Sequence, residues 1–77
     1  MNVSVELFAF LEKYYPDRNG SNMVVLTSGA TVATLIKKLG IPSNLRLLIL
    51  VNGQQSDKGT TLQDNDEVFI FLPAEGG

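Results

Sequence analysis

The sequence contains no cysteine, no histidine and no tryptophan. Their absence removes the usual general base near neutral pH, the thiol nucleophile and the commonest ligands of transition metals. Serine, threonine and lysine remain, but nothing in the sequence pairs them with an activating base. We therefore expect a protein that is not an enzyme by itself and that holds no metal or cofactor of its own.

Positive charge and long apolar runs are also scarce. The chain has 77 residues, six lysines and arginines, and a net charge of −2. The cations are scattered, which argues against nucleic acid as a partner. No strictly apolar run is longer than that of residues 47–51, which is far too short to span a membrane. Without a signal-peptide pattern or a disulfide framework, we expect a cytoplasmic protein with no membrane partner.

What is present is typical of one small folded domain. Hydrophobic residues make up 44% of the chain and charged residues 18%, as in a globular protein rather than a disordered one. Residues 1–72 carry the regular patterns, and residues 73–77 read as a flexible tail ending in Gly76 and Gly77. A frayed terminus or a cloning remainder is the plain alternative for this tail.

The first third of the chain predicts two strands. The segment "NVSVELF" alternates, placing Val3, Val5 and Leu7 on one side and Phe8 on the other. "AFLEKYYP" changes to helical spacing and stops at its proline. The loop "PDRNGSN", with the turn signal Asn19-Gly20, leads to a second strand, "MVVLT". We expect the two strands to form a hairpin.

"SGATVATLIKKLGIP" is the clearest helix. Thr31 can cap its first amides, and Gly40 fits the position just past its end. Its apolar stripe consists of Val32, Leu35, Ile36 and Leu39. Lys37 and Lys38 lie in the last turn. They could dock an acidic partner, but solvated lysines that complement the helix dipole are the favoured interpretation.

Two more main strands follow the helix. "LRLLILVNG" is apolar on both faces, which indicates that both are covered, and it ends in the turn signal Asn52-Gly53. A very short strand fits near Gln54 and Gln55, and "EVFIFLP" is the last strand. Before it, Asp64, Asp66 and Glu67 could form a weak cation site, although a turn with Asn65 in the left-handed conformation is favoured. This order predicts an α+β domain with the helix across one sheet face.

Several local motifs resemble the MoaD/ThiS family of ubiquitin-like sulfur carriers, which includes the small subunit of molybdopterin synthase. They are "LFA" in the first strand, "GATVATLIKKLG" at the helix, "VNG", and "LQDNDEVFIF" before the closing "PAEGG". The resemblance covers nearly the whole chain. It implies a ubiquitin-like β-grasp fold, with a mixed four- to five-stranded sheet in which the first and last strands are neighbours.

The resemblance also implies a chemistry for the tail. In this family a ubiquitin-activating-like adenylyltransferase uses ATP to adenylate the terminal carboxylate, here that of Gly77, and sulfur then replaces one oxygen to give a thiocarboxylate. Gly76 and Gly77 lack Cβ atoms and suit a narrow channel in a partner. Five residues from Pro73 would reach roughly 17 Å when extended. A carrier without cysteine must hold its sulfur elsewhere, and the terminus is the obvious place.

The resemblance suggests two acceptor enzymes and leaves two other functions open. Molybdopterin synthase large subunit, for molybdopterin or tungsten-pterin synthesis, is the favoured acceptor, and the thiazole synthase of thiamin synthesis is the alternative. A ubiquitin-like protein modifier and a β-grasp interaction module without tail chemistry are the further alternatives. The sequence does not decide the sulfur donor or the oligomeric state.

Three phenylalanines form a second candidate site. By alternation, Phe8, Phe69 and Phe71 point away from the helix-covered face, and neighbouring first and last strands would gather them into one aromatic surface. The resemblance places Phe8 and Phe71 at the contact with the large subunit. The alternative is a second small core under Tyr14 and Tyr15.

The tail before the glycines is the third part of the predicted partner-binding site. It comprises Pro73, Ala74 and Glu75. Relatives often carry small or apolar residues here, so Glu75 is a departure from the family pattern. It indicates either a basic docking channel or a partner other than the standard synthase.

Overall fold

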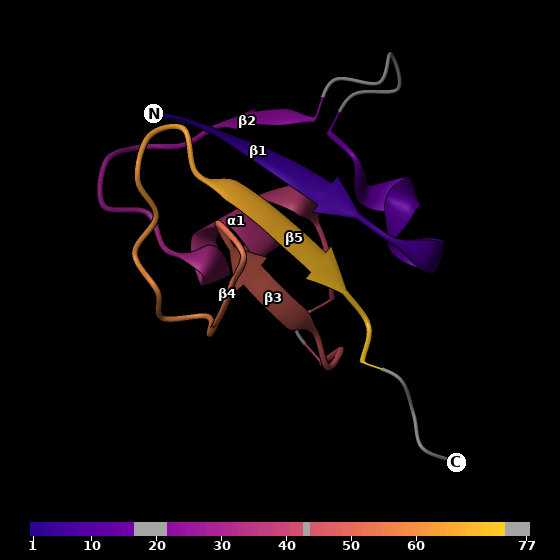
Figure 1. Cartoon of the computed structure of the whole chain (residues 1–77). Helices are drawn as coiled ribbons and strands as arrows, with labels where there is room; N and C mark the ends of the chain where they lie inside the picture. Colours follow the sequence, from indigo (N-terminus) through magenta and orange to yellow (C-terminus); the bar gives the residue numbers. More distant parts are fainter. Residues whose placement is uncertain (17–21, 43, 74–77) are drawn as a thin grey trace.

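Seven elements make up the described chain, which covers residues 1–16, 22–42 and 44–73 of a computed structural model (Figure 1). One α-helix lies across one face of a five-stranded sheet, in which the strands follow the order β2-β1-β5-β3-β4. The elements, in chain order, are β1 (Asn2–Leu7), the 3₁₀ helix η1 (Ala9–Tyr14), β2 (Met23–Val25), α1 (Val32–Leu39), β3 (Leu48–Val51), β4 (Gln54–Ser56) and β5 (Glu67–Phe71).

The sheet is mixed, because β1 and β5 are parallel while the other neighbouring strands are antiparallel. β1 and β5 run in parallel, with Val5 opposite Val68 and Leu7 opposite Ile70. β1 pairs with β2, and β3 pairs with both β4 and β5, in antiparallel fashion. The predicted α+β class, the first hairpin and the adjacency of the first and last strands are all confirmed.

The core lies between the sheet and α1. Because side chains alternate along a strand, every second strand residue points toward the helix, and the apolar stripe of the helix packs against these residues. Nine side chains are less than 2% exposed: Val3, Val5, Leu7, Leu11, Val32, Leu35, Leu62, Val68 and Ile70. We call this helix-covered side of the sheet the closed face and the other side the open face.

The ends of α1 follow from its sequence. Thr31 and Thr34 form a reciprocal capping box, in which each side chain accepts a hydrogen bond from the other residue's backbone amide. Gly40 ends the helix with φ of 84°, a left-handed conformation that glycine adopts without strain. The Lys38 ammonium donates a hydrogen bond of 2.9 Å to the carbonyl of Val25, so this lysine joins the helix to β2.

The turns also agree with their residue types. Asn52 and Gly53 both have positive φ, 53° and 85°, as the tight turn between β3 and β4 requires. Asn65 has φ of 71°, as predicted. Within the described residues, no helix is both long enough and apolar enough to cross a membrane.

Two details differ from the sequence prediction. The segment after β1 is a 3₁₀ helix, in which Leu11 is buried while Phe10 is 53% exposed, so its apolar residues do not share one inward face. β3 is shorter than its apolar run, and Leu45 and Leu47 pack against the core from the preceding loop. The predicted turn at Asn19-Gly20 and the tail beyond Pro73 lie outside the described residues.

Candidate functional site

Phe8, Phe69 and Phe71 come together on the open face, as the sequence predicts. The Phe8 ring lies 6.0 Å from the Phe69 ring and 5.6 Å from the Phe71 ring, measured between centroids. The second pair meets edge to face, at 85°, which is a favourable geometry for aromatic rings. Phe8 is 42% exposed, and the two rings on β5 are half-buried.

Leu50 completes this surface, and the sequence analysis did not identify it. With the three phenylalanines it lines a shallow hollow of about 320 Å³, and none of the described residues in its lining is polar. Leu50 lies opposite Phe69 in the register of β3 and β5, which fixes it on the open face. We call the four residues the aromatic patch. The run "LRLLILV" is apolar from Leu47 to Val51, so nothing in its sequence pattern shows that Leu50 faces away from the buried Ile49 and Val51.

Tyr14 and Tyr15 do not form a second core with the phenylalanines. Both tyrosines pack against the core of the closed face. The Tyr15 hydroxyl accepts a hydrogen bond of 2.9 Å from the Leu7 amide, and it lies 3.1 Å from a carboxylate oxygen of Glu6. Burial raises the pKa of Tyr15 above its usual 10.0; the Leu7 bond opposes this rise and Glu6 adds to it.

The open face has an apolar end and a polar end. Ser4 on β1 lies opposite Glu67 at the start of β5, and Glu6 lies opposite Phe69, where the polar end meets the aromatic patch. Phe71 ends β5, so the aromatic patch occupies the end of the sheet from which the chain continues toward Gly76 and Gly77. The last described residue of this path, Pro73, is half-buried. Ala74, Glu75, Gly76 and Gly77 lie outside the described residues.

The acidic cluster before β5 is a turn. An Asp64 oxygen accepts the Asn2 amide at 2.7 Å, and Asp66 accepts the Gln63 amide and the Asn52 side-chain amide, both at 2.8 Å. These carboxylates therefore hold the backbone of neighbouring loops together. In residues 1–16, 22–42 and 44–73, no group of acidic side chains is arranged to hold a metal ion.

Solved structures of small ubiquitin-like proteins have the same fold. A crystal structure of small archaeal modifier protein 1 from Haloferax volcanii superposes with a TM-score of 0.75 and 22% identity, over 95% of this chain and 98% of that one. A structure of SAMP1 from Haloferax volcanii gives 0.71 and 22%, over the full length of both chains. A putative molybdopterin converting factor, subunit 1, from Pyrococcus furiosus gives 0.76 and 23%, over 96% and 99%.

These identities support the fold alone. The ubiquitin-like β-grasp predicted from the sequence is thereby confirmed. No curated protein matches the chain. A family model does match, and its description is "ThiS family". Because that match runs from residue 5 to residue 77, the chain belongs to the ThiS family of small carrier proteins.

Proposed function

We propose that this protein is a sulfur carrier whose Gly77 carboxylate is activated by adenylation and converted to a thiocarboxylate. Membership of the ThiS family and the β-grasp fold support this proposal. The sequence offers no cysteine to hold sulfur in any other way. The small carriers of this family are generally not catalysts, so the activating and accepting steps belong to partner enzymes.

The position of the aromatic patch carries the proposal. Phe71 belongs to the aromatic patch and is the last residue of β5. Gly77 follows it six residues later in the sequence. A partner that covers the patch therefore meets the chain at the point where the tail departs. An apolar patch is well suited to such a contact, because its burial supplies affinity that the glycines cannot supply.

The proposed chemistry balances without a redox step on the carrier. A carboxylate oxygen of Gly77 attacks the α-phosphorus of ATP, and pyrophosphate leaves. Hydrosulfide then attacks the acyl carbon, the bond from that carbon to the oxygen shared with AMP breaks, and AMP leaves with this oxygen. The result is a terminal thiocarboxylate. In the acceptor enzyme its sulfur attacks a substrate carbon and displaces the group bound there, and water then cleaves the resulting thioester, so that the sulfur stays on the substrate and Gly77 returns as a carboxylate.

Molybdopterin synthase large subunit is the acceptor that we favour. The structural similarity to a putative molybdopterin converting factor subunit supports this choice. A thiazole synthase is the alternative acceptor within the family. In either case we expect a basic channel for the tail, because Glu75 adds a negative charge just before the two glycines.

A protein-modifier function is the second candidate. The similarity to small archaeal modifier protein 1 favours it, since that structure aligns over nearly the whole of both chains. The same adenylate would then react with a lysine amine instead of sulfide, and the product would be an isopeptide bond. Isopeptide-linked conjugates in cell extract would distinguish this function from sulfur transfer.

Intact mass spectrometry tests the proposal directly. The chain is incubated with a ubiquitin-activating-like adenylyltransferase, ATP and sulfide, next to a variant that ends at Glu75. We expect a mass gain equal to the exchange of one oxygen for one sulfur, only in the longer chain. The truncated variant is a matched control, because it keeps every described residue and lacks only the two glycines.

Binding of the acceptor completes the test. Loss of Gly76 and Gly77 should abolish sulfur transfer while leaving contact through the aromatic patch intact. No mass gain with several such activating enzymes would contradict tail chemistry. It would leave the aromatic patch as the site of a simple interaction module.

A further inference from the structure

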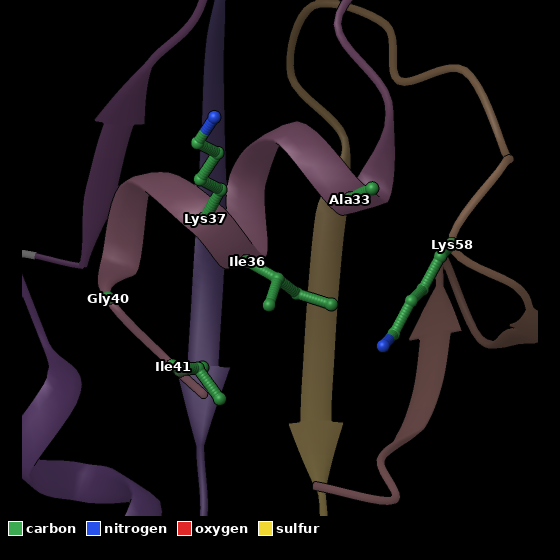
Figure 2. A pocket seen from close by; sticks show the side chains of 6 residues that line it. All are labelled: Ala33, Ile36, Lys37, Gly40, Ile41 and Lys58. Atoms are coloured by element: carbon green, nitrogen blue, oxygen red, sulfur yellow. The ribbon is translucent and has the colours of Figure 1, made fainter. Parts of the chain in front are cut away.

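A second apolar hollow lies on the closed side of the molecule, away from the aromatic patch. It runs between α1 and the loop after β4 and has a volume of about 480 Å³ (Figure 2). Ile36 and Ile41, each 4% exposed, provide the apolar floor. We call it the helix groove; its lining residues are Ala33, Ile36, Lys37, Gly40, Ile41 and Lys58.

The charge of the helix groove has one sign. Lys37 and Lys58 are both exposed, and none of the described residues that line the groove is acidic. In Figure 2 the Lys58 side chain extends toward Ile36 and Ile41, while Lys37 rises from the helix next to Ile36. The adjacent Asp57 is engaged in its own turn, where one carboxylate oxygen accepts from the Gly59 amide at 3.0 Å and lies 3.3 Å from the Thr60 hydroxyl.

Two backbone hydrogen bonds hold the groove in shape. The Ala33 amide donates to the Lys58 carbonyl, and the Val32 amide donates to the Thr60 carbonyl, both at 2.9 Å. These bonds also satisfy amides of the first helical turn, which have no partner within the helix. Lys58 is therefore attached to the start of α1, and the groove needs little ordering before a ligand binds.

We propose that the helix groove binds an acidic segment of a partner protein, with one aliphatic side chain on Ile36 and Ile41 and flanking carboxylates near Lys37 and Lys58. Charge complementarity selects this occupant, because the groove combines an apolar floor with cations only. The groove and the aromatic patch lie on opposite sides of the sheet, so both can be occupied together. The proposal does not depend on the chemistry of Gly77.

A pair of short peptides tests this proposal with the full chain. The probe is acetyl-Asp-Asp-Leu-Ile-Glu-Glu-amide, and the control is acetyl-Asn-Asn-Leu-Ile-Gln-Gln-amide. Each is titrated into ¹⁵N-labelled protein, and the amide shifts report where it binds. We expect saturable shifts of Ala33, Lys37, Gly40 and Lys58 with the acidic peptide, and affinity at least about fivefold weaker for the neutral one, since two exposed ion pairs are lost.

Charge variants locate the interaction. The double variant Lys37→Gln with Lys58→Gln should weaken binding about fivefold, while Lys38→Gln should change it less than about twofold. Lys38 is a matched control, because it loses the same charge one residue along but contacts β2 instead of the groove. Ala33→Glu should abolish binding by repulsion and still fold, because an acidic residue in the first helical turn suits the helix dipole.

Four results would overturn the proposal. The first is no saturable shift with the acidic peptide, and the second is equal affinity for the two peptides. The third is a set of shifts confined to Lys13, Tyr14 and Lys38, which line a separate cleft between η1 and α1. The fourth is displacement of the acidic peptide by inorganic phosphate at an equal concentration, because the apolar floor would then contribute nothing to binding.

Discussion

The two faces of the sheet are built from alternate residues of the same strands, yet they differ in how deeply their side chains are buried. On β5, Val68 and Ile70 face α1 and are fully buried, while Phe69 and Phe71 face the other way and are half-buried. On β3, Ile49 and Leu50 differ in the same way. Both sets are apolar, so hydrophobicity does not decide which is covered. The position of the one α-helix decides it.

This difference has a simple cause in chain length. Within its described residues, this 77-residue domain has one α-helix, which covers one face of the sheet, and its core holds the aliphatic residues that close packing favours. The open face keeps large rings that remain accessible. The closed face therefore stabilises the fold, while the open face is available for a partner. The predictions below test that division of roles.

The largest expected effect is on stability, through the closed face. Ile70→Ala should lower the free energy of unfolding by about 3 kcal/mol, because it leaves a cavity among residues that cannot collapse to fill it. Phe69→Ala, one residue earlier on the open face, should cost only about 1 kcal/mol, from its ring contact with Phe8. Urea unfolding of the two variants measures both values. Equal losses would refute the division between the faces.

Much of this architecture was predictable because its signals are local. Strict alternation specified the faces of β1, and the capping residue Thr31 and Gly40 set the ends of α1. The contact of Phe8 with Phe71 depended on the pairing of β1 with β5, which the family resemblance supplied. Alternation alone gives no strand order.

The features that were missed depend on contacts between distant segments. Leu50 sits in a continuous apolar run, where no alternation marks its face; only its register with Phe69 does. Lys58 lies in a loop of the sequence, and its place beside α1 depends on the hydrogen bond that its carbonyl accepts from the Ala33 amide. Neither relation leaves a trace in spacing or composition.

The second prediction concerns affinity, through the open face. Phe71→Ala should weaken binding to the acceptor that we propose, a molybdopterin synthase large subunit, about 30-fold, because an aromatic ring that becomes buried in an interface carries much of the binding energy. Val25→Ala is the matched control, since Val25 is 64% exposed on β2 and away from the aromatic patch. Isothermal titration calorimetry measures both. If the control loses as much affinity, the interface lies elsewhere.

The third prediction separates the helix from the open face. Thr31→Ala removes the capping box and should cost about 1 kcal/mol of stability, whereas Thr31→Ser should keep most of it. Neither variant should change affinity at the aromatic patch, because α1 covers only the closed face. A matched fall in affinity at a temperature where both variants are folded would mean that the two faces are coupled through the sheet.

The smallest expected effect is a pH dependence at the junction of the two faces, where Tyr15 joins Leu7 and Glu6. Its pKa is raised in the folded state, mainly by burial, so the folded chain holds the phenol proton more tightly than the unfolded chain does. This contribution to stability is therefore complete below about pH 10 and falls as the pH rises through the folded-state pKa.

The substitution Tyr15→Phe isolates the contribution of the Tyr15 hydroxyl to stability. At neutral pH the variant should be less stable by about 1 kcal/mol, because the Leu7 amide loses its acceptor. Above about pH 10 the gap between the two chains should narrow, since only the wild-type chain has the Tyr15 proton to lose. Urea unfolding at about pH 8 and about pH 11 measures the gap. A gap that widens with pH would mean that the tyrosinate is stabilised in the fold, against the desolvation and the Glu6 charge that surround this hydroxyl.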